Sequence, residues 1–295
     1  MNPVTRLFFL LFFLVICHAL LARDLDEIRR SGVLRHIGVP YAHFVTGSGD
    51  GLDVDLMRAF AKHLGVRYEY VRSDWAHVIG DLLGRKVRRE KGGGVELLDP
   101  VPVRGDVIAN GLTMLPWREK VVAFAEPTFP SGVWLIASAN SSLEPIRPGA
   151  SRSRDIALVK SLLSGRAVLA LKNTCLDPDL YDLAGSGADI RLQPEGRKLN
   201  EMVPAILNGD AESTLLDVPD ALIALERWPG RIKVIGPVSG EQTMAPVFRR
   251  DAPALRAEFQ RFFNDLWNSG VYARWVKRYY PAVFDYFREF FSRSR

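Results

Sequence analysis

Short apolar stretches alternate with amphipathic ones along almost the whole chain. Within 66–70 the apolar residues occupy every second position, as in a half-buried strand, and within 53–64 they recur at helical spacing, with Gly65 as a stop. The same patterns predict strands over 33–39, 66–70, 106–109, 132–138, 166–171, 212–216 and 231–235, and helices over 53–64, 74–83, 155–164, 199–208, 217–228, 252–267 and 271–280. Strands that alternate with helices are typical of an α/β fold with a largely parallel sheet.

Two segments interrupt this rhythm. Residues 86–103 are basic and Gly-rich and contain Pro, which predicts an exposed loop or hairpin inserted into the fold. Residues 139–154 are rich in Ser, Pro and Arg and are typical of a surface connector.

The N-terminus has a different character. An apolar run over 7–17 follows Arg6, and the segment ends with small residues near Ala22, as at a cleavage site. Charged residues follow at once. This pattern predicts a signal peptide over 1–22. A buried helix and an uncleaved anchor are the less favoured alternatives. Lipidation of Cys17 is less favoured, because Ile16 stands where a small residue is usual.

Composition narrows the function classes. The 295-residue chain has a formal charge of +5, which becomes +4 without residues 1–22, since these hold Arg6 and no acid. Basic residues are mixed with acidic ones, which does not favour a nucleic-acid binder. Cys175 is the one cysteine outside 1–22, so no internal disulfide is expected. No Cys/His cluster has the spacing of metal ligands, and we expect neither a metal nor another cofactor.

Several motifs resemble, in order, those of the family 3 bacterial extracellular solute-binding proteins. The motifs are 32–39, 51–56 (Gly-Leu-Asp-Val-Asp-Leu), 64–66, 74–79, 105–107, 111–127, 208–217 and 251–281. The resemblance covers essentially all of the chain after residue 22. It implies a two-lobed clamshell of the type II periplasmic-binding kind, with mostly parallel sheets and a two-strand hinge. By analogy, 24–132 plus 244–295 would form the first lobe, with 86–103 inserted, and 133–243 the second.

The resemblance also implies a ligand held between the lobes. Arg118 matches the family arginine, and its planar guanidinium can grip a carboxylate with two hydrogen bonds. Its alternative is a surface arginine paired with Glu119 or Glu126. Asp217 matches the family acid that accepts hydrogen bonds from a ligand ammonium, but it is equally well explained as a helix N-cap.

Further cleft positions follow from the same matches. Asn173 and Thr174 stand where the family has a Gly-Thr pair whose amides bind the carboxylate, and Leu115 stands where it has a threonine. Tyr41 and Phe44 would form apolar walls for the ligand, whereas Trp75 is interpreted as core. Because of the changes at Leu115 and Asn173, three alternatives to an amino acid stay open: a different carboxylate, a peptidoglycan fragment, or no ligand at all.

We therefore expect a periplasmic, monomeric, non-catalytic receptor that captures an amino acid or related carboxylate for a membrane permease. One alternative is a sensor or accessory protein that uses the same clamshell. Another is a dehydratase-like lyase, which needs a general acid from among Glu126, Glu212 and Asp217. A fused lytic transglycosylase domain, found in some similar proteins, is not expected within these 295 residues.

Overall fold

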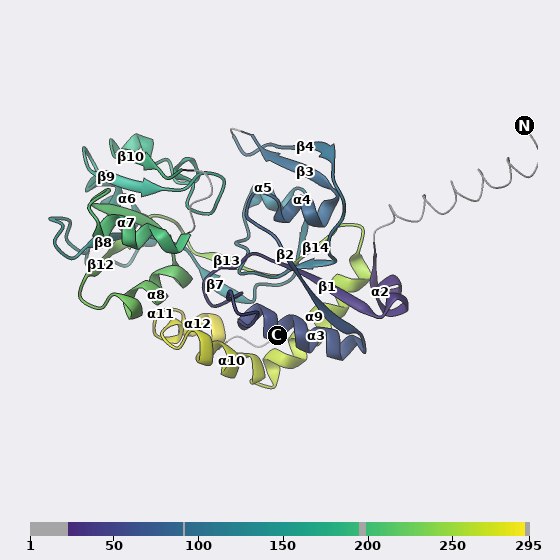
Figure 1. Ribbon diagram of the computed structural model, residues 1–295. Helices are drawn as coiled ribbons and strands as arrows, with labels where there is room; N and C mark the ends of the chain where they lie inside the picture. The colour runs from purple at the N-terminus through teal and green to yellow at the C-terminus, as the bar shows by residue number, and fades with distance from the viewer. Residues whose placement is uncertain (1–22, 91, 195–198, 293–295) are drawn as a thin grey trace, which may run out of the picture.

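Two β-sheets, each covered by helices, form the two lobes of the protein (Figure 1). The computed structural model describes residues 23–90, 92–194 and 199–292. The predicted signal peptide, with Cys17, lies outside the described residues. In the described part, no helix is long and apolar enough to cross a membrane.

The first lobe is built on a five-stranded sheet in the order β2-β1-β5-β14-β6. Its strands are β1 (Val33–Gly38), β2 (Arg67–Arg72), β5 (Val107–Ile108), β6 (Ala123–Phe124) and β14 (Val247–Phe248). Its helices are α2 (Leu25–Ser31), α3 (Leu52–Leu64), α4 (Val78–Leu83), α5 (Pro116–Glu119) and α9 (Pro253–Asn268). The apolar face of α3, with Leu56 and Phe60 fully buried, packs against this sheet and α9.

The second lobe is built on a five-stranded sheet in the order β10-β9-β11-β8-β12. Its strands are β8 (Val133–Ser138), β9 (Ala167–Ala170), β10 (Asp189–Leu192), β11 (Ser213–Asp217) and β12 (Ile232–Pro237). Its helices are α6 (Arg152–Ser161), α7 (Met202–Leu207), α8 (Val218–Arg227) and the 3-10 turns η2 (Pro178–Leu180), η3 (Ala184–Ser186) and η4 (Leu199–Glu201). The segment 139–151, within the predicted connector, contains no helix or strand.

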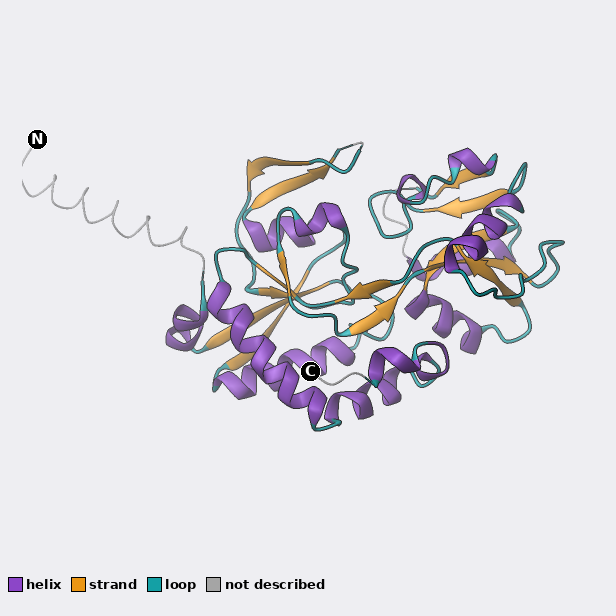
Figure 2. Ribbon diagram, turned by 180° about the vertical axis from the view of Figure 1, so that it is seen from behind, coloured by secondary structure: helices purple, strands orange, loops and turns teal. Residues whose placement is uncertain are grey.

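Two short strands carry the chain between the lobes. β7 (Phe129–Ser131) and β13 (Gln242–Met244) pair antiparallel and lie between the two sheets, as Figure 2 shows from behind. The chain crosses to the second lobe through β7 and returns through β13, so this pair is placed to act as a hinge.

The C-terminal helices pack along both lobes. They are α10 (Val271–Tyr279), α11 (Val283–Tyr286) and α12 (Arg288–Phe291). Phe291 packs against Trp267 of α9, and Tyr286 lies 5.3 Å, ring to ring, from Trp134 of the second lobe. Aromatic side chains of these helices therefore pack against both lobes.

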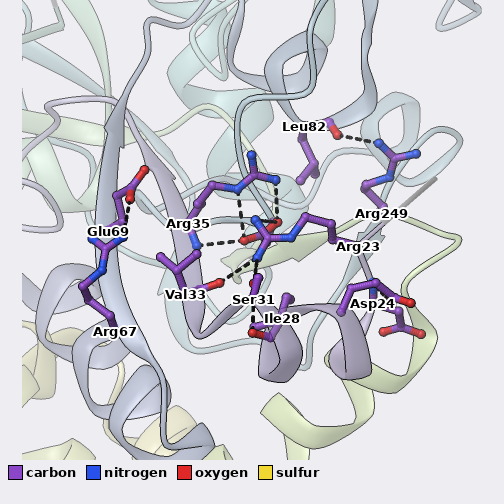
Figure 3. Close-up of polar contacts among 12 residues, drawn as sticks. Arg23, Asp24, Ile28, Ser31, Val33, Arg35, Arg67, Glu69, Leu82 and Arg249 are labelled. Atoms are coloured by element: carbon purple, nitrogen blue, oxygen red, sulfur yellow. Dashed lines mark hydrogen bonds and ion pairs between the residues drawn. The ribbon is translucent and has the colours of Figure 1, made fainter. Parts of the chain in front are cut away.

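A buried carboxylate fixes the start of β5, the strand that leads to the cleft. Asp106, 2% exposed, accepts hydrogen bonds from the backbone and guanidinium of Arg35 (2.8 and 3.0 Å) and pairs with Arg23 (3.5 Å). Arg23 also donates to the Val33 carbonyl at 2.8 Å (Figure 3). A buried charge needs such partners, so this network joins α2, β1 and β5 into one rigid corner.

The sheets are mixed rather than mostly parallel. In the first, β1 pairs parallel with β2 and β5, whereas β14 pairs antiparallel with β5 and β6. In the second, β8 pairs antiparallel with β11 and β12. The reason is that β14 and β8 enter their sheets directly from the hinge strands, without the helical crossover that a parallel neighbour needs.

The segment 86–103 contains a hairpin, β3 (Arg85–Arg89) and β4 (Val95–Pro100), which forms a two-stranded sheet of its own. It stands on α4, and its free end is directed toward the second lobe in both views (Figures 1 and 2).

Candidate ligand-binding cleft

A small cavity of about 10 Å³ lies between the lobes, which is about enough for one water molecule. The first lobe lines it with Tyr41, Trp75, Gly111, Thr113 and Arg118, and the second with Thr174, Cys175, Leu199 and Asp217. The structure therefore brings together four of the predicted site residues (Tyr41, Arg118, Thr174 and Asp217), one cation and one acid among them.

Arg118 enters the cavity from α5, which begins at Pro116 after the loop that follows β5. The side chain is buried, and its Nη1 donates to the Thr113 carbonyl at 2.8 Å. Its buried Nε has no hydrogen-bond partner among the described residues. Burial lowers the pKa of Arg118 to about 10. The group is still a cation at neutral pH, and an anion in the cavity would satisfy both its charge and its free donor.

Asp217 lines the same cavity from the second lobe, at the end of β11 and the start of α8. Its Oδ1 accepts the backbone N–H of Asp220 (3.3 Å), which makes it the N-cap of α8. Its Oδ2 accepts the Tyr41 hydroxyl (2.5 Å) and the Cys175 thiol (3.2 Å). Burial raises the pKa of Asp217, although these hydrogen bonds oppose the rise. One oxygen of Asp217 is thus the helix cap, and the other is bonded to two cavity residues, whereas its role toward a ligand ammonium stays a prediction.

Tyr41 joins the lobes through its hydrogen bond to Asp217. Its ring stacks on Phe44 (5.8 Å) and meets the edge of Trp75 (5.4 Å). Trp75, interpreted from its spacing as core, lines the cavity, whereas Phe44 lies buried beneath Tyr41 and does not line it. Trp75 also packs against the hydrophobic core, and it lies in the turn before α4, which begins only at Val78.

The loop after β9 places Thr174 and Cys175 in the cavity. Thr174 Oγ1 donates to the Leu171 carbonyl (2.9 Å) and accepts from the Leu176 N–H (3.0 Å), so the loop holds its own shape. Asn173 is exposed and does not line the cavity, but its φ of 62° is a conformation that glycine adopts freely. Asparagine tolerates it better than most residues, which explains how Asn173 can replace a glycine here.

Leu115, the other departure from the family pattern, is buried at the N-cap of α5 without lining the cavity. Sequence reasoning missed Gly111, Thr113, Cys175 and Leu199. Gly111 and Thr113 stand between the end of β5 and Arg118, a position that could have drawn attention to them. Cys175 and Leu199 gave no signal, because an isolated apolar or thiol side chain looks like core.

Electrostatically, the cavity combines one arginine with an acid whose pKa is raised. The described residues contain no group of three or more His, Cys, Asp or Glu side chains that could hold a metal ion. A wider surface depression of about 540 Å³, lined by residues such as Lys160, Asp179 and Gln242, lies on the second lobe and includes none of the predicted site residues.

The model of the bacterial extracellular solute-binding proteins, family 3, matches residues 103–282, more than half of the chain. The protein belongs to this family. The resemblance drawn from the motifs is thus confirmed.

Solved structures of this architecture confirm the two-lobed fold. A P235GK mutant of ArgBP from T. maritima has a TM-score of 0.66 and 22% identity, over 87% of this chain and 99% of that one. The ancestral amino acid-binding protein AncCDT-1, a precursor of cyclohexadienyl dehydratase, has a TM-score of 0.65 and 21% identity over 87% and 98%. The GluR0 ligand-binding core from Nostoc punctiforme, in complex with L-glutamate, has a TM-score of 0.62 and 16% identity. That match covers 84% of this chain and 99% of the other.

A curated relative is membrane-bound lytic murein transglycosylase F of Desulfosudis oleivorans, which is 28% identical over 239 residues. The match covers 80% of this chain and 46% of that protein, so the chain spans about half the length of this relative.

Proposed function

We propose that this family 3 protein is an extracytoplasmic receptor that closes around an amino acid or a related carboxylate and delivers it to a membrane permease. The observation that carries the proposal is Arg118. It is a buried cation between the lobes whose Nε has no partner among the described residues. Leaving such a donor unpaired costs about 1–3 kcal/mol, which an incoming carboxylate would recover.

Ligand binding would couple to lobe closure. Arg118 belongs to the first lobe, whereas Thr174 and Asp217 belong to the second, so a ligand that touches all three favours the closed state. With room for about one water in the cavity, the lobes must separate before a ligand enters and must settle farther apart around it.

We propose binding without catalysis. Glu212 pairs with Arg166 at 2.7 Å and does not line the cavity, and Glu126 is exposed. Asp217 lines it, and its raised pKa is the one feature that favours the lyase alternative, because a general acid must hold a proton. Three hydrogen-bond donors already engage its oxygens. They favour the charged carboxylate over the protonated acid, which supports a binding role.

Thermal unfolding of the purified protein with a panel of amino acids, simple carboxylates and muropeptides tests the proposal. A ligand at one hundred times its dissociation constant should stabilise the folded protein by about 2.7 kcal/mol. The shift should disappear in Arg118→Ala. It should be small in Arg118→Lys, which keeps the charge but loses the planar fork.

A panel that produces no shift in the wild-type protein would contradict the proposal for these ligand classes. A shift that survives unchanged in Arg118→Ala would place the binding site elsewhere. In that case the surface depression beside Lys160 and Gln242 would be the next region to test.

A further inference from the structure

The β3–β4 hairpin belongs by its attachment to the first lobe. At its base, the Val101 N–H donates to the Gly84 carbonyl (2.9 Å), and the Arg104 N–H donates to the Asp81 carbonyl (2.8 Å). Near its turn, Lys120 Nζ donates to the Gly93 carbonyl (2.7 Å). Lys120 follows α5 directly, so the hairpin is tied at both ends to the lobe that carries Arg118.

One contact of the hairpin crosses to the second lobe. Arg89, the last residue of β3, pairs with Asp177 through Nη1 and Oδ2 at 2.8 Å. The two side chains are only 14% and 4% exposed. Two further ion pairs among the described hairpin residues, Arg88–Glu96 and Lys86–Asp99, join its own two strands on the surface.

Asp177 in turn shapes the loop that lines the cavity. Its Oδ2 also accepts the Asn173 N–H (3.2 Å), and its Oδ1 accepts the Asp179 N–H (3.0 Å). Thr174 and Cys175, both cavity residues, lie inside the turn that these bonds close. Arg89 therefore holds, from the first lobe, the acid that organises the ligand-facing loop of the second.

The pair has a direct consequence for lobe movement. Because Arg89 and Asp177 belong to different lobes, the contact exists when the lobes are closed and is lost when they separate. Opening gives up a charge-assisted hydrogen bond that is largely shielded from water in the closed form and therefore little screened, which is costly. The Arg88–Glu96 pair, confined to the hairpin and exposed, carries no such cost on opening.

We propose that Arg89 is a positioning residue that latches the closed state by pairing with Asp177 and holding the 173–179 loop. Its role in ligand affinity rests on the proposed function, whereas its effect on the ligand-free protein does not. The latch raises the closed fraction before any ligand arrives. Because the cavity between the closed lobes has room for about one water molecule, only the separated lobes can admit a ligand, so the latch lowers apparent affinity by reducing the competent fraction.

Small-angle X-ray scattering and amide hydrogen exchange of the ligand-free full chain test the latch. Arg89→Ala should increase the radius of gyration and speed exchange within 173–179 by about tenfold or more. Asp177→Asn keeps an oxygen for the local amides but loses the charge, and should give the same shift. The double variant should add little to either single one, as expected for partners. Arg88→Ala is the matched control and should behave as wild type.

The latch is wrong if Arg89→Ala has the scattering profile and exchange rates of the wild type, or if Arg88→Ala changes both equally. Arg118→Ala separates the two proposals. Arg118 bonds within its own lobe, so this variant should lose ligand stabilisation without a change in ligand-free scattering. If no ligand in the panel binds the wild-type protein, the proposed function fails, and the scattering comparison still decides the latch.

Discussion

The Asp217 carboxylate performs two tasks at the start of α8. One oxygen caps the helix, and the other accepts the Tyr41 hydroxyl across the cleft. The sequence could predict each task separately, because Asp before a helix is a common cap and its position matches the family acid. It could not predict their combination, or the thiol of Cys175 on the same oxygen, because these depend on how the lobes meet.

Asp53 offers a residue-scale prediction about pH. Its Oδ2 accepts the Gly111 N–H (2.7 Å), its buried Oδ1 has no partner among the described residues, and burial raises its pKa to about 7. Between the ordinary value of 3.8 and about 7, the folded protein holds a proton that the unfolded chain releases. The Asp53 contribution to the free energy of unfolding therefore falls as pH rises through this window, by about 4 kcal/mol in total.

Urea unfolding of Asp53→Asn and wild type from pH 4 to pH 8 measures this contribution. The variant has no proton to lose there, so its stability relative to wild type should improve steadily up to about pH 7. Other buried acids contribute equally to the free energy of unfolding of both proteins, so their contributions cancel in the difference. A difference that does not change with pH would show that Asp53 is not protonated in the folded state.

At the scale of elements, the alternation of strands and helices locates most of the two sheets. The predicted 33–39 strand and 53–64 helix correspond to Val33–Gly38 and Leu52–Leu64. The strands β6, β7, β13 and β14 were missed because segments of two or three residues carry no measurable period. β10 was missed because its residues, Asp-Ile-Arg-Leu, are mostly exposed at the edge of the sheet.

The hairpin provides the element-scale prediction. Arg85 and Pro100 face each other at its base, so a short Asn-Gly turn can replace residues 86–99 without stretching the chain. Both five-stranded sheets remain intact, and unfolding in urea should stay cooperative with a loss below about 2 kcal/mol. Failure to obtain folded protein would show that the hairpin is part of the core.

At the scale of the whole molecule, polar contacts between side chains join the closed lobes around a nearly filled cleft. Tyr41–Asp217 lies inside the cavity, and Arg89–Asp177 connects the hairpin to the opposite lobe. The clamshell could be predicted from the order of weak motifs along the chain. The cross-lobe contacts could not, because each joins residues more than eighty positions apart whose pairing depends on the angle between the lobes.

The central claim is that Arg118 binds a ligand carboxylate between the lobes. The most direct measurement is a calorimetric titration that compares a ligand from the panel with its amide, in wild-type protein and in Arg118→Ala. Charge-assisted hydrogen bonds are worth about 1.5–3 kcal/mol, so the wild type should prefer the carboxylate by about tenfold to a hundredfold. That preference should vanish in the variant. A wild-type protein that binds acid and amide equally, or a variant that keeps the preference, would contradict the account.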